Sequence, residues 1–180
     1  MKTSKDRNNT IVISLGDPAG IGTEITLKAL GSKLLNKNIQ PLLVGCKNNI
    51  YKTYSSLISH GINNIPNPNN LNIIDIPLKS EITPGIVNKE TGSASFDWLY
   101  KATKILIEGK GRALTTAPIS KIAWHKAGHK FAGQTELLGK LTNKKTSMLF
   151  TAVSPNNGWR FNTLLATTHI PFSKVNNSLT

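Results

Sequence analysis

The chain has 180 residues, of which 38% are hydrophobic and 17% charged, and its formal net charge is +13. This length suits one ordinary domain with a core and is short for a two-domain enzyme. No apolar run approaches the roughly 20 residues of a membrane helix, the first ten residues lack the apolar segment of a signal peptide, and Cys46 is the single cysteine. We therefore expect a cytoplasmic protein that spans no membrane and has no disulfide.

The positive charge raises the alternative of a basic nucleic-acid-binding module, because lysine and arginine neutralise phosphates. Residues 1–90 carry ten basic and six acidic side chains, and residues 91–180 carry twelve and three, without a block of like charges. Only three of the 22 basic residues are arginine, whose bidentate fork serves base and phosphate recognition best. We therefore expect no nucleic-acid partner.

Apolar periodicity predicts strands and helices that alternate along most of the chain. In chain order we expect strands at residues 11–15, 41–45, 71–76, 112–116, 147–153 and 161–167, and helices at residues 21–30, 49–60, 89–108, 120–127 and 135–141. Strands that are nearly continuous in apolar residues and are followed by helices are typical of a mostly parallel sheet covered on both faces. The predicted fold is therefore a three-layer α/β/α arrangement.

Ligands in such sheets collect at the carboxyl ends of strands, which directs attention to residues 16–22, 115–121 and 167–171. Residues 16–22 read Gly-Asp-Pro-Ala-Gly-Ile-Gly and form either a tight turn or a loop that a ligand approaches closely. They are not a dinucleotide fingerprint, because Ile25 stands where a third glycine is needed. Lys121 follows the second of these strands and is either a solvated side chain or a ligand for phosphate or carboxylate.

Two further segments contain candidate site residues. Residues 133–136 read Gly-Gln-Thr-Glu, where Thr135 is a candidate helix N-cap and Gln134 and Thr135 are able to hydrogen-bond a polar ligand. His169 follows a predicted strand, where a single histidine is either a hydrogen-bonded structural residue or a metal ligand. The chain has no H-E-x-x-H, paired cysteines, P-loop or G-x-S-x-G.

Taken in order, residues 16–22, 115–121, 133–136 and 166–171 resemble the amino-terminal half of the 4-hydroxythreonine-4-phosphate dehydrogenase family, and the likeness runs from about residue 11 to residue 180. The resemblance implies an NAD- or NADP-dependent enzyme of vitamin B6 (pyridoxal phosphate) biosynthesis. That enzyme oxidises and decarboxylates 4-phosphooxy-L-threonine to 3-amino-2-oxopropyl phosphate. A divalent metal ion (Zn, Mg or Co) would bind the substrate hydroxyl and favour both steps.

The resemblance also implies a homodimer of two-domain subunits with an isocitrate/isopropylmalate dehydrogenase-like architecture. Residues 1–141 would belong to a first α/β domain, incomplete because the family's domain is discontinuous, and residues 142–180 would begin a second. His169 matches a metal ligand of the family, and Gln134 and Thr135 match a pair that contacts substrate. Phosphate binding by Lys121 is our own hypothesis.

The sequence departs from the family in two ways. Some relatives carry histidine in place of Gln134, and glutamine cannot transfer a proton near neutral pH. The family also continues for roughly as long again, and its remaining metal histidines and most of its dinucleotide site lie in that part. We therefore expect a fragment that is inactive alone and has apolar surface uncovered.

Three alternatives stay open at this point. The first is a related dehydrogenase of a four-carbon sugar-acid phosphate, threonate or erythronate 4-phosphate. The second is the basic nucleic-acid-binding module, which only the charge supports. The third is a non-catalytic remnant that folds or pairs with a partner.

Overall fold

The computed structural model describes residues 9–36, 38–167 and 170–179. The chain divides into two compact units, Met1–Thr142 and Asn143–Thr180, and each is described by itself. The assignment of residues 142–180 to the start of a second domain stays a prediction. No helix in the described part of the chain has the length and apolar character needed to cross a membrane.

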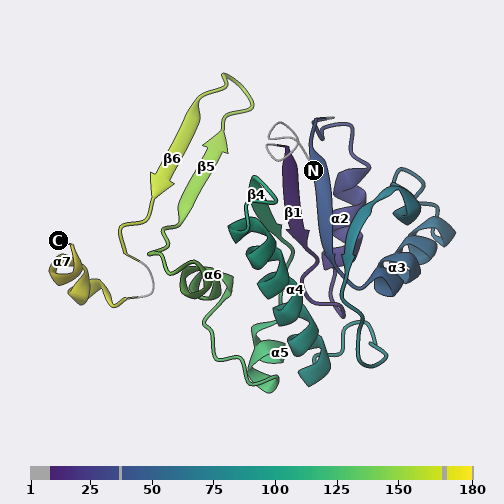
Figure 1. Cartoon of the computed structure of the whole chain (residues 1–180). Coiled ribbons are helices and arrows are strands. Elements are labelled where there is room, and N and C mark those ends of the chain that lie inside the picture. Colours follow the sequence, from purple (N-terminus) through teal and green to yellow (C-terminus); the bar gives the residue numbers. More distant parts are fainter. Residues whose placement is uncertain (1–8, 37, 168–169, 180) are drawn as a thin grey trace. The chain divides into compact units, whose positions relative to one another are not determined.

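Strands and helices alternate in the first unit (Figure 1). Its elements are β1 (Thr10–Ser14), α2 (Gly22–Leu30), β2 (Gln40–Gly45), α3 (Lys47–Ser59), the short 3-10 helix η1 (Pro68–Asn70), β3 (Asn72–Asp75), α4 (Lys89–Ile107), β4 (Ala113–Thr116), α5 (Lys121–Lys126) and α6 (Gln134–Thr142). Each strand and helix predicted in this part of the sequence is present, with its ends moved by at most two residues.

The four strands form one parallel sheet in the order β3-β2-β1-β4. Val12 in β1 is opposite Leu42 on one side and Leu114 on the other. Helices α2 and α3 cover one face of the sheet and α4 covers the other (Figure 1). The predicted mixed α/β fold with a mostly parallel sheet is therefore confirmed.

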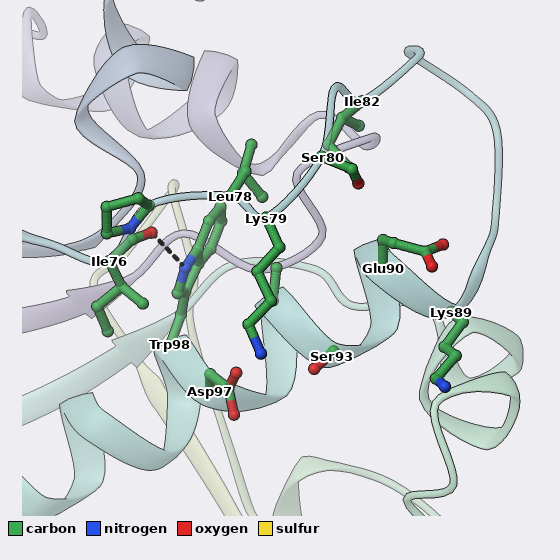
Figure 2. Close-up of a pocket in the computed structure, with 12 residues that line it drawn as sticks. Ile76, Leu78, Lys79, Ser80, Ile82, Lys89, Glu90, Ser93, Asp97 and Trp98 are labelled. Atoms are coloured by element: carbon green, nitrogen blue, oxygen red, sulfur yellow. Dashed lines mark hydrogen bonds between the residues drawn. The ribbon is translucent and has the colours of Figure 1, made fainter.

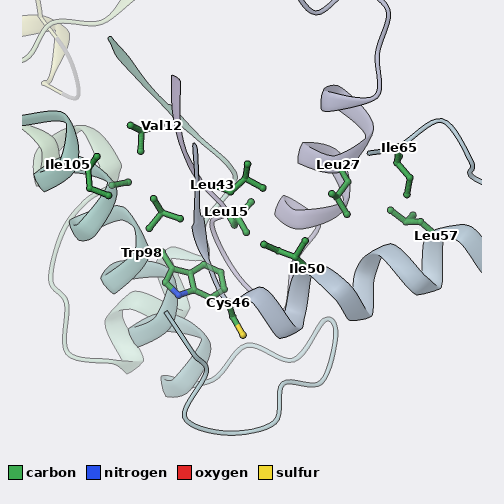
Figure 3. Close-up of a cluster of buried hydrophobic side chains, with 12 residues drawn as sticks. Val12, Leu15, Leu27, Leu43, Cys46, Ile50, Leu57, Ile65, Trp98 and Ile105 are labelled. Carbon is green, nitrogen blue, oxygen red and sulfur yellow. The ribbon is translucent and has the colours of Figure 1, made fainter. Parts of the chain in front are cut away.

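The main core lies on both faces of this sheet and includes one large, fully buried tryptophan. Trp98 of α4 is fully buried, and its indole N–H donates to the carbonyl of Ile76 at 3.2 Å (Figure 2). In Figure 3, side chains of the central strands lie between those of α4 and those of α2 and α3. The buried set includes Val12, Leu15, Leu27, Leu43, Ile50, Leu57, Trp98, Ala102 and Ile105.

A smaller cluster fixes the helices that follow β4. Leu99, Trp124 and Leu137 are buried together and connect α4 with α5 and α6. The indole N–H of Trp124 donates to the hydroxyl of Ser95 at 2.8 Å, so the polar edge of this ring is satisfied inside the packing. This cluster sets the position of α6, whose first residue is Gln134.

The second unit differs from the parallel arrangement expected for its strands. Strands β5 (Leu149–Val153) and β6 (Arg160–Leu164) form a separate two-stranded antiparallel sheet, followed by η2 (Phe172–Lys174) and α7 (Val175–Ser178). The reason is the short connection between the two strands. Only residues 154–159 separate the two strands, and Gly158 with φ of 71° helps the turn, whereas a parallel pair needs a crossover of a dozen residues or more.

Candidate functional site

The strand order reverses beside β1, with β2 and β3 on one side and β4 on the other. At such a reversal, the loops that follow the two neighbouring strands lead to opposite faces and leave a crevice at the carboxyl ends of the strands. Here the two loops are residues 15–21, which lead to α2, and residues 117–120, which lead to α5. They overlap residues 16–22 and 115–121, for which the sequence left open a structural turn or a ligand loop, and the structure brings the two loops together.

Backbone hydrogen bonds join these loops directly. The N–H of Asp17 donates to the carbonyl of Pro118 at 2.9 Å, and the N–H of Ala117 donates to the carbonyl of Ser14 at the same distance. Gly16 has φ of 72°, and a Cβ atom on it would lie 2.2 Å from the Pro118 oxygen. Only glycine fits this contact, so the glycine-rich sequence is explained by the approach of two backbones.

Asp17 is a further candidate residue, which sequence reasoning treated only as part of its loop. Its side chain is buried, and its Oδ1 accepts a hydrogen bond from the N–H of Ala19 at 2.9 Å. Burial raises the pKa of this carboxyl, and the hydrogen bond from Ala19 opposes that rise. The D-P-A spacing is an Asx-turn signal that could have identified Asp17 in advance.

Gln134 is held against the β4 loop from α6. Its Nε2 donates to the carbonyl of Ala117 at 3.2 Å, and its Oε1 is buried without a hydrogen-bond partner among the described residues. A carbonyl oxygen only accepts, so this contact fixes which end of the amide faces Ala117. A buried unsatisfied acceptor costs about 1–3 kcal/mol, so such a group in a native protein needs an explanation, and contact with a ligand is one.

Lys121 and Thr135 are the other two candidate substrate residues. Lys121 is the first residue of α5 and is exposed, with Ser120 capping the helix by accepting from the N–H of Ala123 at 3.2 Å. The Lys121 Nζ is 3.8 Å from the point where a Cβ atom on Gly133 would stand. Thr135 is half-buried in the first turn of α6, which begins at Gln134, so its predicted N-cap role is wrong.

The predicted metal ligand His169 lies outside the described residues. In the part of the chain that the structure describes, no three His, Cys, Asp or Glu side chains are grouped to hold a metal ion. These residues alone therefore do not fit a divalent metal, which for zinc takes about three protein ligands. We derive no chemical step through a metal from them.

A family model described as "Pyridoxal phosphate biosynthetic protein PdxA" matches residues 31–180. The chain belongs to this family. It is 50% identical over 171 residues to the 4-hydroxythreonine-4-phosphate dehydrogenase of Synechococcus sp. (strain RCC307), with 94% of this chain and 51% of that protein covered. It is 37% identical over 146 residues to the D-threonate 4-phosphate dehydrogenase of Pectobacterium atrosepticum, with 75% and 44% covered.

Solved structures agree with the family. The chain is similar to a 4-hydroxythreonine-4-phosphate dehydrogenase from Klebsiella pneumoniae with a TM-score of 0.73 at 29% identity, covering 94% of this chain and 53% of that one. The chain therefore spans about half the length of the PdxA relatives that it matches. These relatives confirm the family resemblance that four ordered segments of the sequence indicated.

Proposed function

We propose that this PdxA-family chain forms part of the substrate site of a dehydrogenase that oxidises and decarboxylates 4-hydroxythreonine 4-phosphate in pyridoxal phosphate biosynthesis. The observation that supports it best is the position of Gln134 at the loop after β4, beside the strand-order reversal: its amide donates to the Ala117 carbonyl, and the Lys121 ammonium lies near the adjacent Gly133. The 50% identical relative carries the corresponding name. The activity belongs to the whole protein, about twice the length of this chain in the relatives.

Each candidate residue has a role in this proposal. Gln134 and Thr135 contact the substrate, and the ammonium of Lys121 attracts its phosphate. His169 supplies one metal ligand, and the other ligands and most of the dinucleotide site come from the remaining half. The whole protein would be a cytoplasmic homodimer with an isocitrate/isopropylmalate dehydrogenase-like architecture, using NAD or NADP and a Zn, Mg or Co ion.

The unsatisfied Oε1 of Gln134 determines which kind of ligand group this site favours. An amide oxygen that lacks a donor favours a ligand group with an N–H or O–H over a carboxylate or phosphate oxygen. The substrate's ammonium and hydroxyl groups are such donors, whereas its phosphate is better placed beside Lys121. A small shift at the start of α6 would expose Oε1 to the substrate, because the atom is buried in the free chain.

The second candidate is oxidation of D-threonate 4-phosphate, which the name of the Pectobacterium relative favours. The two substrates differ at carbon 2, where one has an ammonium group and the other a hydroxyl. Both groups donate hydrogen bonds, so Gln134 accepts either of them. A direct comparison of the two substrates decides between these functions.

The test uses this chain alone and the same chain joined in frame to the remaining half of the Synechococcus relative. NADH or NADPH formation is followed by absorbance with a divalent metal and either substrate. We expect no turnover from the chain alone and turnover from the joined protein, faster with 4-phosphooxy-L-threonine than with D-threonate 4-phosphate. Turnover by the 180-residue chain alone would refute the proposed division of the site between two halves.

Two variants of the joined protein test the residue roles. Gln134→Leu removes the amide and should lower kcat/KM by about ten- to a hundredfold, the cost of one or two polar contacts. Lys121→Gln should raise KM for the phosphorylated substrate with less effect on kcat. Lys110→Gln, whose ammonium pairs with Glu108 at the distant end of α4, is the control. Kinetics of both site variants equal to the control would exclude these roles.

A further inference from the structure

A second hollow lies away from the candidate substrate site, between α4 and the segment that joins β3 to it. Its volume is about 260 Å³, which is room for about nine water molecules. The apolar part of its lining, called the floor here, consists of Ile76, Leu78, Ala94 and Trp98. Ile76, Leu78 and Trp98 are labelled in Figure 2. The same segment reaches the glycine-rich loop, because the N–H of Gly85 donates to the carbonyl of Ala19 at 2.7 Å.

Charged side chains of both signs surround this floor. Lys79 comes from the segment, whereas Lys89, Glu90 and Asp97 come from the first turns of α4. In Figure 2, the Lys79 side chain extends along α4 towards Asp97 and Ser93. The pocket therefore combines an apolar base with two cations, two carboxylates and hydroxyl groups.

These four charges are not paired with one another. Among the described residues, none of them forms an ion pair within 4 Å. On the other side of the same segment, Lys52 and Glu81 do pair, with Nζ and Oε1 3.4 Å apart. Unpaired charges of opposite sign around an apolar floor are suited to a ligand that brings both complementary charges and an apolar body.

We propose that this pocket binds a free aliphatic α-amino acid. Its carboxylate would face the Lys79 ammonium, its ammonium would face the Asp97 carboxylate, and its side chain would lie over Leu78 and Ala94. The site is separate from the loops of β1 and β4. Its existence does not depend on the dehydrogenase activity, so either proposal can fail without the other.

The experiment uses the ¹⁵N-labelled 180-residue chain and follows its amide resonances by NMR during titration with three matched probes. L-leucine carries both charges. 4-Methylpentanoate has the same skeleton without the ammonium, and 3-methylbutylamine has it without the carboxylate. We expect saturable shifts at residues 78–82 and 93–98 with leucine, and binding at least about twofold to fivefold weaker for each one-charge probe, the range for exposed ion pairs.

Variants assign each charge to its partner. Asp97→Asn should weaken the binding of leucine about twofold to fivefold. It should leave the binding of 4-methylpentanoate unchanged, because that probe has no ammonium group for Asp97 to contact. Lys79→Gln should weaken the binding of leucine by a similar factor and leave the binding of 3-methylbutylamine unchanged. Lys52→Gln, on the other side of the segment, is the matched control. The proposal is overturned if leucine produces no saturable shift at these residues, or if all three probes bind equally.

Discussion

Two glycines with left-handed backbone conformations separate the effect of a close contact from that of φ alone. Gly16 has φ of 72° and a backbone oxygen 2.2 Å from its Cβ position, whereas Gly61 has φ of 80° and nothing within 4 Å. Gly61→Ala should therefore lower the free energy of unfolding by about 1–2 kcal/mol, the cost of this φ for alanine. Gly16→Ala should lower it by about 1–3 kcal/mol more, because the loops must separate.

Urea-induced unfolding of the two variants and the parent chain measures this difference. Equal losses would mean that the loop from β1 and the loop from β4 do not approach as closely as the structure shows.

The amide of Gln134 gives a second residue-scale prediction, with a defined pH dependence. Gln134→Glu places a carboxylate opposite the Ala117 carbonyl, which should cost about 1–3 kcal/mol at neutral pH. Protonation would restore a donor towards Ala117, so this loss should shrink as the pH falls. Gln134→Met removes the donor and the unsatisfied acceptor together, and it should change stability by less than about 1 kcal/mol.

Unfolding free energies at neutral and acidic pH test this pair of variants. A glutamate variant as stable as the parent at neutral pH would contradict the contact with Ala117.

Asp17 gives a third residue-scale prediction, in which the titrating carboxyl belongs to the parent chain. Burial raises the folded-state pKa of its carboxyl above the usual value of 3.8, so the native state binds the proton more tightly than the unfolded state. The protonated form therefore stabilises the fold at low pH, and this contribution is lost as pH rises through the raised pKa. Asp17→Asn keeps an acceptor for the Ala19 N–H without a charge.

The asparagine variant should gain stability relative to the parent as pH rises from 3.8 towards neutrality. Parallel unfolding measurements across this range provide the check. A difference between the two proteins that stays constant with pH would show that burial does not disfavour the charge of Asp17.

At the residue scale, the sequence singled out the segments of the candidate site but not the atoms that meet there. Strand-to-helix turns and their glycines are local signals, so residues 16–22 and 115–121 could be selected from spacing alone. The bond from Gln134 to the Ala117 carbonyl depends on how the cluster of Leu99, Trp124 and Leu137 positions α6. The spacing of residues along the sequence does not reveal this packing, so the contact could not be predicted.

At the scale of elements, the contact of α4 with α5 depends on a glycine inside a helix. A Cβ atom on Gly92 of α4 would lie 2.0 Å from the carbonyl oxygen of Ala123 in α5. Alanine normally stabilises a helix interior by about 0.5–1 kcal/mol relative to glycine. Here the sign should reverse, and Gly92→Ala should lower the free energy of unfolding by about 1–3 kcal/mol because the helices are forced apart.

Ser93→Ala at the next position is the control and should stay within about 0.5 kcal/mol. Chemical unfolding followed by circular dichroism distinguishes the two variants. A stabilised Gly92→Ala chain would show that α4 and α5 are not in this close contact.

Helices and parallel strands were predictable because their apolar periods repeat over many residues, as along α4. The pairing of β5 with β6 was not, because both strands carry apolar residues on each face. Leu149 and Leu164 are opposite each other on one face, and Ala152 and Phe161 are opposite on the other. Such strands resemble those of a buried parallel sheet, and only the short connection distinguishes them.

At the scale of the whole chain, the two units differ in how much apolar surface they bury. The first has a continuous core around the parallel sheet. None of the buried hydrophobic residues in the described part of the chain belongs to the second unit. An isolated two-stranded hairpin is marginally stable in water, so the second unit should unfold or associate more readily than the first.

Exposed side chains of the hairpin therefore predict self-association of the 180-residue chain. Phe150 and Phe161 lie on the same face of the hairpin and are 53% and 48% exposed, and Trp159 beside Phe161 is 62% exposed. Contiguous apolar surface of this kind favours association with other copies. Light scattering should show an average mass that rises above 19.6 kDa with concentration.

Replacing both phenylalanines, Phe150→Ser and Phe161→Ser, should reduce this rise because it removes the largest apolar groups from one face. Ile107→Ser, at the end of α4 where the side chain is 49% exposed, is the matched control and should associate like the parent. If the parent keeps the monomer mass at every concentration, the hairpin face is not an associating surface. If the Ile107 variant loses association as fully as the double variant, the contact lies on the first unit instead.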